Sequence, residues 1–234
     1  MNYTIYPLGD NAITIQLGKH INEETFNKVQ TVFQQLNNQS FEWLVELVPS
    51  YTAVTLYYDL LKLFRQVVSP FQWVCQTIQP LLNDLQVEKK TDIRINEIPV
   101  CYEEPFSPDL QHLTQYHQLT KDEIISIHSE TTYLVYMIGF SPGFPYIGGM
   151  SRRIATPRKA TPQKRIEAGS VGIAGEQTGI YSLDTPGGWN IIGKTPLKMF
   201  QPHLDKPSFL KAGDHIQFIP IDIATFKRLE EKQR

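Results

Sequence analysis

Prolines and glycines punctuate the sequence densely beyond residue 100, and the apolar runs between them are short. Runs of this kind, bounded by turn residues, are typical of strands in a closed sheet, because each strand must reverse direction after a few residues. The one segment there with clear helical features is Thr120–His128, where Thr120 and Glu123 have the spacing of a capping box. This part of the chain is therefore predicted to form an all-β barrel.

The strands predicted for this barrel are short and separated by turn-rich segments. They are Asp92–Val100, Thr132–Ile138, Ser170–Ala174, Gly179–Tyr181, Trp189–Ile192 and His215–Pro220.

The first 90 residues follow a different pattern, in which pairs of strand-like runs alternate with helical segments. The predicted pairs are Tyr3–Tyr6 with Ala12–Leu17 and Leu44–Val48 with Ala53–Tyr58. A helix is expected after each pair, the first beginning at the N-cap residue Asn22 and the second covering about Phe71–Leu85. The order ββαββα favours a small α+β sandwich with helices on one face of a mostly antiparallel sheet.

A charged run, Glu88–Lys90, separates the two patterns and marks a candidate domain boundary. A chain of 234 residues is long enough to form two domains. We therefore predict an α+β domain over residues 1–90 and a β-barrel domain over residues 91–234.

Composition excludes several classes of protein. The net charge is −2, so no positive field would attract nucleic acid or an anionic membrane. Cys75 and Cys101 are the only cysteines and form no Cys-x-x-Cys pair, which fits a reducing compartment. Met1–Pro7 has no signal-peptide pattern and no apolar stretch is long enough to span a bilayer, so a cytoplasmic protein is expected.

The segment Gly139–Gly149 packs glycines and prolines among aromatic residues directly after a predicted strand. Proline fixes φ, whereas glycine permits positive φ or close approach of the backbone. Such a stiff, apolar loop would suit the wall of a ligand site. A well-packed structural corner would have the same composition.

The segment Arg152–Arg165 holds six cations in fourteen residues of a slightly acidic chain. Guanidinium groups form bidentate contacts with carboxylates and phosphates, so this segment would suit an anionic substrate group. An acidic partner surface and a simple solvated basic face are the alternatives.

The segment Glu167–Tyr181 contains four glycines and is followed by Gly187-Gly188-Trp189. Glycine within strand-like runs indicates bulges or crowded backbone. Amides near Gly172 and Gly175 would suit an oxyanion, with Trp189 as the wall of a cleft. A glycine-kinked barrel corner around a buried tryptophan is the structural alternative.

Gly188–Thr195 formally matches the phosphate-loop pattern, but its context argues against nucleotide binding. A phosphate loop needs a helix starting near its lysine, whereas Pro196 follows here at once and Trp189–Ile192 is predicted as a strand.

His128 is the histidine adjacent to these segments and is a candidate general base or hydrogen-bond donor, or else a charge partner of a helix C-terminus. The remaining histidines have no metal-ligand spacing, so no metal site is predicted.

Three of these segments, in this order, resemble the KipI-like family, which includes the B subunit of 5-oxoprolinase. They are Gly139–Gly149, Arg152–Arg165 and Glu167–Tyr181 with the Gly187-Gly188-Trp189 that follows it. That family is related to allophanate hydrolase subunit 1 and to part of the carboxyltransferase domain of urea carboxylase. The resemblance covers nearly the whole chain, beginning at Pro7–Asp10, including Gly139–Tyr146 and being densest over Ala168–Pro196.

This resemblance implies an α+β fold with an N-terminal ferredoxin-like α/β domain and a C-terminal cyclophilin-like β-barrel. It also implies two partners, namely the A subunit of 5-oxoprolinase together with a KipA-like C subunit. The complex would open the ring of 5-oxoproline (pyroglutamate) to L-glutamate with hydrolysis of ATP, with Mg²⁺, at a site where two barrels meet. The chain alone would be inactive, and the nucleotide chemistry would reside mainly on a partner.

Some positions depart from the family pattern. Glu167, Ser182 and Lys194 stand where Pro, Pro and Arg are common, and Gln163 replaces a frequent Arg. Lys194 is therefore expected to act as a substitute cation.

Site roles follow from the three segments and the resemblance. Catalytic roles are predicted for His128, Arg158, Gln177 and Thr178. Substrate contacts are predicted for Phe140, Pro142, Gly143, Phe144, Tyr146, Gly172, Gly175, Trp189 and Lys194. The alternatives are an inhibitor of a sporulation-type sensor histidine kinase and an allophanate hydrolase or carboxyltransferase-like subunit.

Overall fold

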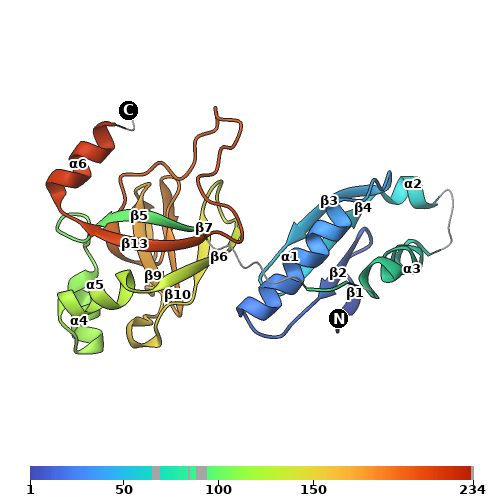
Figure 1. Cartoon of the computed structure of the whole chain (residues 1–234), viewed down its shortest axis with the longest axis horizontal. Helices are drawn as coiled ribbons and strands as arrows, with labels where there is room; N and C mark the ends of the chain where they lie inside the picture. Colours follow the sequence, from blue (N-terminus) through green and yellow to red (C-terminus); the bar gives the residue numbers. More distant parts are fainter. Residues whose placement is uncertain (65–68, 84, 88–93, 233–234) are drawn as a thin grey trace. The chain divides into compact units, whose positions relative to one another are not determined.

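The computed structural model describes residues 1–64, 69–83, 85–87 and 94–232. The chain forms two compact units, Met1–Thr91 and Asp92–Arg234 (Figure 1). The charged run predicted as the boundary, Glu88–Lys90, lies outside the described residues. None of the helices in the described part of the chain is both long and apolar enough to cross a membrane.

The first unit is a four-stranded antiparallel sheet with helices packed on it. Its elements are β1 (Thr4–Pro7), β2 (Ala12–Gln16), α1 (Glu23–Asn37), β3 (Leu44–Pro49), β4 (Ala53–Tyr58), α2 (Leu60–Phe64) and α3 (Pro70–Asn83). The strand order is β1-β2-β4-β3. Both predicted strand pairs are confirmed, and α2 is a short helix that the sequence pattern did not predict.

Helix α1 shows how the sequence specifies this unit. The Asn22 side chain accepts a hydrogen bond of 2.8 Å from the Thr25 amide, as its N-cap position predicts. Its apolar residues recur at helical spacing and are buried with those of α3 against the central strands β2 and β4. The core of this unit contains Ile13, Ile15, Val29, Val32, Leu36, Val54, Leu56, Val74, Ile78 and Leu82.

The second unit is built around a closed seven-stranded barrel with strand order β10-β7-β6-β13-β5-β12-β9. Its strands are β5 (Ile95–Cys101), β6 (Thr132–Ile138), β7 (Pro145–Gly148), β9 (Ser170–Ala174), β10 (Gln177–Ile180), β12 (Asn190–Lys194) and β13 (His215–Ile221). A separate two-stranded ribbon pairs β8 (Gln163–Ile166) with β11 (Thr185–Gly187). Closure satisfies both edges of the sheet, so the barrel presents no unpaired strand.

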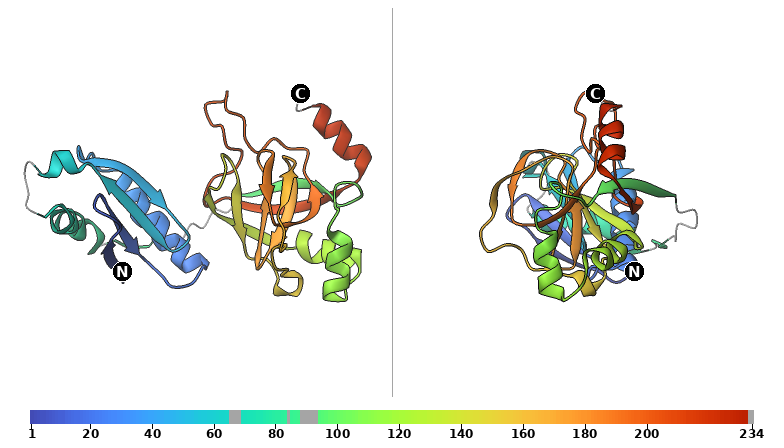
Figure 2. Two further views of the ribbon diagram at one scale, coloured as in Figure 1. Left: turned by 180° about the vertical axis from the view of Figure 1, so that it is seen from behind. Right: turned by 90° about the vertical axis from the view of Figure 1, so that its left-hand side faces the viewer.

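In the described part of this unit, three helices and a 3-10 turn accompany the barrel. They are α4 (Leu110–His117), α5 (Lys121–Ser129), η1 (Arg152–Ile154) and α6 (Ile223–Glu231). Figure 2 shows α4 and α5 side by side at one end of this unit and α6 on the opposite side. The predicted capping box at α5 is confirmed, since Thr120 and Glu123 bond reciprocally.

The chain differs from the sequence-based expectation in two places. The expectation of one helix beyond residue 100 is wrong, because α4 and α6 are also present. The segment Gly139–Gly149 is a loop only in its first half, because Pro145–Gly148 forms β7 and pairs with β6 and β10. The loop itself reverses the chain with Phe140 at φ 68° and Gly143 at φ 76°.

Candidate substrate-binding site

A groove of about 400 Å³ in the second unit separates α4 from the chain that precedes β8. It is lined by Asp109, His112, Tyr116, Thr156, Pro157, Arg158, Lys159, Ala160 and Asn190. The predicted basic segment and the segment that follows Trp189 therefore meet at one hollow.

Asp109 fixes the position of this groove's wall. One of its carboxylate oxygens accepts a hydrogen bond of 2.7 Å from the Ile191 amide, and the other pairs with Lys159 Nζ at 2.5 Å. The Asp109 amide also donates to the Ile191 carbonyl at 3.0 Å. The residue thus ties the start of α4 to β12 and to the basic segment.

Further hydrogen bonds hold the basic segment in place. Asn190 donates its side-chain amide to the Pro157 carbonyl at 2.9 Å and to the Ile173 carbonyl at 3.3 Å. Thr156 bonds to His117 Nε2 at 2.9 Å, and the Lys159 amide donates to the Gly188 carbonyl at 2.7 Å. The backbone on both sides of Arg158 is consequently fixed.

Arg158 is exposed at this groove and has no ion-pair partner among the residues that the structure describes. Lys159, beside it, is neutralised by Asp109. Arg158 also acts on Tyr181: burial raises the pKa of Tyr181 to about 12, and the nearby positive charge of Arg158 opposes that rise. The guanidinium is therefore available to an anion between the groove and Tyr181.

Tyr181 belongs to an aromatic cluster centred on Phe144, which is buried. The Phe144 ring makes edge-to-face contacts with Tyr181 and Trp189, each with centroids 5.5 Å apart, and with Tyr146 at 5.1 Å. The predicted loop, the glycine-rich segment and Trp189 thus pack together. Trp189 is only 5% exposed, so the structural alternative of a buried tryptophan describes it better than an open cleft wall.

Phe140 is the exposed end of this cluster. Its ring lies 5.4 Å from Phe144, edge to face, and the side chain is 65% exposed. A non-glycine residue with positive φ costs conformational energy, and this one presents a large apolar side chain to solvent. Phe140 is therefore the predicted substrate contact that this cluster leaves accessible.

His128 and Thr178 also lie together, but in the barrel interior. His128 is fully buried, stacks on Phe218 with centroids 4.4 Å apart, and bonds to Tyr102 Oη at 2.8 Å and Thr178 Oγ1 at 2.9 Å. Thr178 Oγ1 in turn donates to the Gly172 carbonyl at 3.1 Å. Since that hydroxyl proton is used, Nε2 of His128 must be the donor to Thr178, and Nδ1 accepts from Tyr102.

This arrangement requires a neutral imidazole, and the environment enforces one. Burial lowers the pKa of His128 to about 3. Both side chains are shielded from solvent, which argues against a direct contact of His128 or Thr178 with substrate, and their catalytic roles stay predictions. Their role here is to join α5 to β10.

Gln177 and Thr178 are neighbours on β10, so their side chains point to opposite faces of the sheet. Thr178 points inward to His128, and the next residue, Gly179, faces outward, where an added Cβ would lie 2.9 Å from Trp189 and 3.2 Å from Phe144. Gln177 shares the outer face with Gly179. The four predicted catalytic residues are thus divided, with Gln177 and Arg158 outside the barrel.

The predicted glycine and proline contacts are mostly structural. At Gly143 an added Cβ would lie 2.8 Å from Phe200, and at Gly172 it would lie 3.2 Å from Trp189. The Gly175 amide donates to the Thr156 carbonyl at 2.7 Å, so it is not available to an oxyanion. Gly172 is itself buried between β10 and β12. Pro142 is exposed at the loop tip beside Phe140.

Lys194 is not a free cation, so its predicted role as a substitute cation, which stays a prediction, would have to compete with an ion pair. It pairs with Glu167 at 2.6 Å and lies 5.7 Å from the Phe106 ring centroid, at the end of β12 opposite Asn190. Ser182 bonds to Ser141 at 3.1 Å. Two of the departures from the family pattern, Glu167 and Lys194, therefore compensate each other.

Sequence reasoning missed the residues that build the groove's other wall. Asp109 lies two residues beyond Ser107 in a turn with prolines, and His112 and Tyr116 lie on the unpredicted helix α4. The four-residue spacing of His112 and Tyr116 was a usable signal, because such residues share a helix face. Nothing local marked Asp109, whose partners are 50 and 82 residues away.

The formal phosphate-loop pattern is confirmed as a strand, since Asn190–Lys194 is β12 and is followed directly by Thr195 and Pro196 outside any helix.

A family model described as carboxyltransferase domain, subdomain C and D, matches residues 3–210. The chain belongs to this carboxyltransferase-domain family. It is 42% identical to the B subunit of 5-oxoprolinase from Bacillus subtilis (strain 168), over 99% of this chain and 98% of that protein. It is 38% identical to the corresponding B subunit from Haemophilus influenzae, over 92% and 96%. The resemblance seen in the sequence is thereby confirmed.

Solved structures share the fold of this chain. The crystal structure of TTHA0988 matches with a TM-score of 0.77 and 30% identity over 90% of this chain, which spans 40% of that chain. The Kluyveromyces lactis urea amidolyase matches with a TM-score of 0.75 over 99% of this chain and 15% of that chain. Since that identity is 16%, this likeness shows the fold alone.

Proposed function

We propose that this chain is the B subunit of an ATP-dependent 5-oxoprolinase, which opens the ring of 5-oxoproline to L-glutamate and needs other subunits to do so. The observation that carries the proposal is the 42% identity to the B subunit of a 5-oxoprolinase along nearly the whole of both chains. The groove at Arg158 also supports the proposal, because an exposed guanidinium there suits the carboxylate of 5-oxoproline.

The substrate would place its carboxylate at Arg158. 5-Oxoproline is a small anion with a five-membered lactam, and a guanidinium without a competing carboxylate can bind such an anion through two hydrogen bonds. A groove of about 400 Å³ has ample room for the whole molecule.

Hydrolysis of the lactam needs more catalytic groups than this chain alone would supply. A lactam is stabilised by resonance, so its hydrolysis requires donors that balance the charge developing on the amide oxygen. Arg158 and the groove would hold and orient the substrate, whereas His128 and Thr178 are buried away from it. We therefore assign this chain to substrate positioning and expect a partner to complete the site.

We infer that the described residues of this chain do not form an ATP site by themselves. The one phosphate-loop pattern is strand β12, and the described residues contain no group of three or more His, Cys, Asp or Glu placed to hold a metal ion. We propose that ATP and Mg²⁺ bind elsewhere in a cytoplasmic complex formed with the A subunit of 5-oxoprolinase plus a KipA-like C subunit. We also propose that the two units correspond to the ferredoxin-like and cyclophilin-like domains of that family.

The test is to co-purify this chain with its candidate partners and to measure ATP hydrolysis with and without 5-oxoproline. The proposal predicts substrate-dependent hydrolysis and one glutamate formed for each ATP consumed, with no activity for the chain alone. An assembled complex that does not turn over 5-oxoproline would contradict it. That outcome would favour the inhibitor of a sensor histidine kinase.

A second candidate is a carboxyltransferase-like or allophanate-processing subunit, which the family match to a carboxyltransferase domain favours. The same purified complex separates the two possibilities. Turnover of allophanate or carboxybiotin, with none of 5-oxoproline, would select this candidate.

A further inference from the structure

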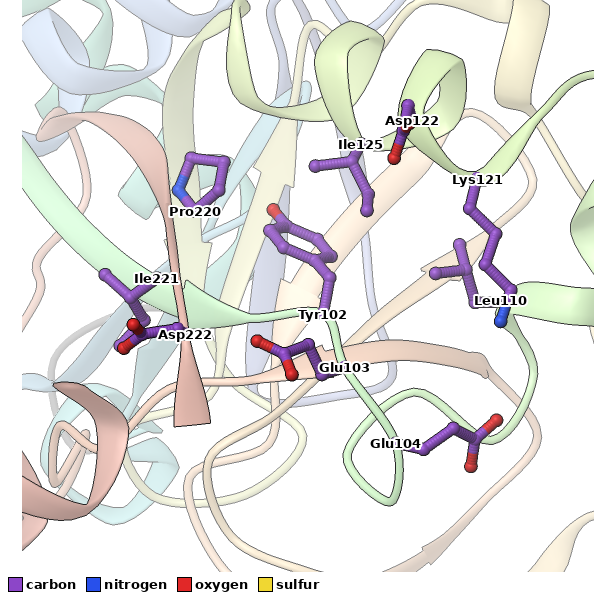
Figure 3. A pocket seen from close by; sticks show the side chains of 10 residues that line it. All are labelled: Tyr102, Glu103, Glu104, Leu110, Lys121, Asp122, Ile125, Pro220, Ile221 and Asp222. Atoms are coloured by element: carbon purple, nitrogen blue, oxygen red, sulfur yellow. The ribbon is translucent and has the colours of Figure 1, made fainter. Parts of the chain in front are cut away.

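A second pocket in the barrel unit, of about 550 Å³, shares no residue with the groove at Arg158. Figure 3 shows its lining, which comes from the chain after β5, the starts of α4 and α5, and the junction of β13 with α6. Its floor is apolar and consists of Tyr102, Leu110, Ile125, Pro220 and Ile221.

Most of the charged residues around this floor are acidic. The carboxylates are Glu103, Glu104, Asp122 and Asp222, and the one cation in the lining is Lys121. Asp222 caps α6 by accepting the Thr225 amide at 2.7 Å. The other three carboxylates have no ion pair or hydrogen bond to their side chains among the residues that the structure describes.

The negative field reaches the neighbouring core. Burial raises the pKa of the Cys101 thiol, and the charges of Glu103 and Asp222 add to that effect. The floor accepts apolar atoms while the rim attracts positive charge, a combination that matches a cationic group on an aliphatic stem.

We propose that this pocket binds an arginine or lysine side chain presented by a partner protein. The aliphatic stem would lie on Ile125 and Ile221, and the charged head would meet Glu103 and Asp122. In Figure 3 the side chains of Glu103 and Asp122 lie on different sides of the Tyr102 ring, so the lining carries negative charge on both sides of that ring.

The carboxylates of this pocket are exposed, so we take the occupant to be a side chain of a protein segment rather than a free amine. Ion pairs at an exposed rim contribute little on their own, whereas a segment adds contacts beyond the pocket. A resident metal ion is a poor fit, since the described residues hold no suitable group of ligands.

The experiment titrates the full-length chain with a short peptide that carries one central arginine and with the same peptide carrying citrulline, which has the same shape without the charge. The readout is the NMR shift of the Ile125 and Ile221 methyl groups, assigned by Ile125→Val and Ile221→Val. We expect both methyls to shift with the arginine peptide and binding to weaken at least about tenfold with citrulline or with Glu103→Gln/Asp122→Asn.

The matched control is Asp205→Asn/Glu46→Gln, which makes the same charge change at exposed positions outside the pocket and should leave binding unchanged. The proposal is overturned if neither methyl shifts at millimolar peptide, or if the citrulline peptide or the pocket variant binds equally well. Free arginine binding as tightly as the peptide would overturn the assignment of a protein partner.

Discussion

His128 shows how strongly the role of one residue depends on where its side chain lies in the fold. In the sequence it lies beside the predicted site and has the chemistry of a general base. In the fold it lies between Tyr102 and Thr178 inside the barrel, and burial lowers its pKa to about 3. The same desolvation that keeps the imidazole neutral makes His128 a determinant of stability at low pH.

Replacing His128 by Gln should reduce the pH dependence of stability. The folded-state pKa of about 3 lies below the unfolded value of 6.5, so the contribution of the neutral imidazole is complete above pH 6.5 and is lost as the pH falls towards 3. This residue alone should lower the free energy of unfolding by about 1.4 kcal/mol per pH unit in that window. Urea denaturation between pH 7.5 and pH 5 measures it.

The control is His203→Gln, at an exposed histidine, which should keep the wild-type slope. At pH 7 the His128 variant should be less stable by about 1–3 kcal/mol, because glutamine has no ring to replace the imidazole that stacks on Phe218. Equal slopes for wild type and His128→Gln would show that His128 is not neutral and buried in solution.

Asp109 gives a second prediction about a single residue. The change Asp109→Asn keeps an acceptor for the Ile191 amide but leaves Lys159, whose side chain is 24% exposed, without its partner. We expect a loss of about 1–3 kcal/mol in the free energy of unfolding. The exposed pair Arg152–Glu176 supplies the control, since Glu176→Gln should cost less than about 0.5 kcal/mol. Similar losses for both would contradict the anchoring role of Asp109.

Among the elements, those with strong local signals were predictable. Asn22 and Thr120 mark helix starts through their own side chains, and the alternating or apolar runs at Thr132–Ile138 and Ser170–Ala174 coincide with β6 and β9. Helix α4 has no side-chain cap to mark its start, and it packs with α5 and β12. Strand β7 has the composition of a loop and is imposed by its neighbours β6 and β10.

The outer face of β10 gives a prediction for this scale. An alanine at Gly179 would place its Cβ 2.9 Å from Trp189 and 3.1 Å from the Pro145 carbonyl, so the aromatic cluster would have to move. We expect Gly179→Ala to destabilise the chain by about 1–3 kcal/mol and to change the fluorescence of Trp189. Denaturation followed by fluorescence measures both.

Gly188→Ala is the matched control, because its nearest neighbour would be 3.5 Å away and its φ is not positive. That variant should stay within about 0.5 kcal/mol of wild type. An unperturbed Gly179→Ala would show that this face is loosely packed.

At the scale of the whole molecule, the sequence predicted the convergence of distant segments better than the roles of single residues. The change in proline and glycine density distinguished an α+β part from a barrel, and the three segments do meet around Phe144, Trp189 and the groove at Arg158. The direction of each side chain was not predictable, because it depends on barrel closure and on strand register. Gln177 and Thr178, for example, are neighbours on β10, and their side chains point to opposite faces.

The central claim is that Arg158 binds the carboxylate of the substrate in a complex that other subunits complete. The most direct test is 5-oxoproline-dependent ATP hydrolysis by the assembled complex containing Arg158→Ala, with Arg153→Ala, an exposed cation of the same segment, as control. The account predicts that Arg158→Ala raises KM for 5-oxoproline at least about tenfold, while Arg153→Ala stays within about twofold of wild type. Equal KM values for the two variants would contradict it.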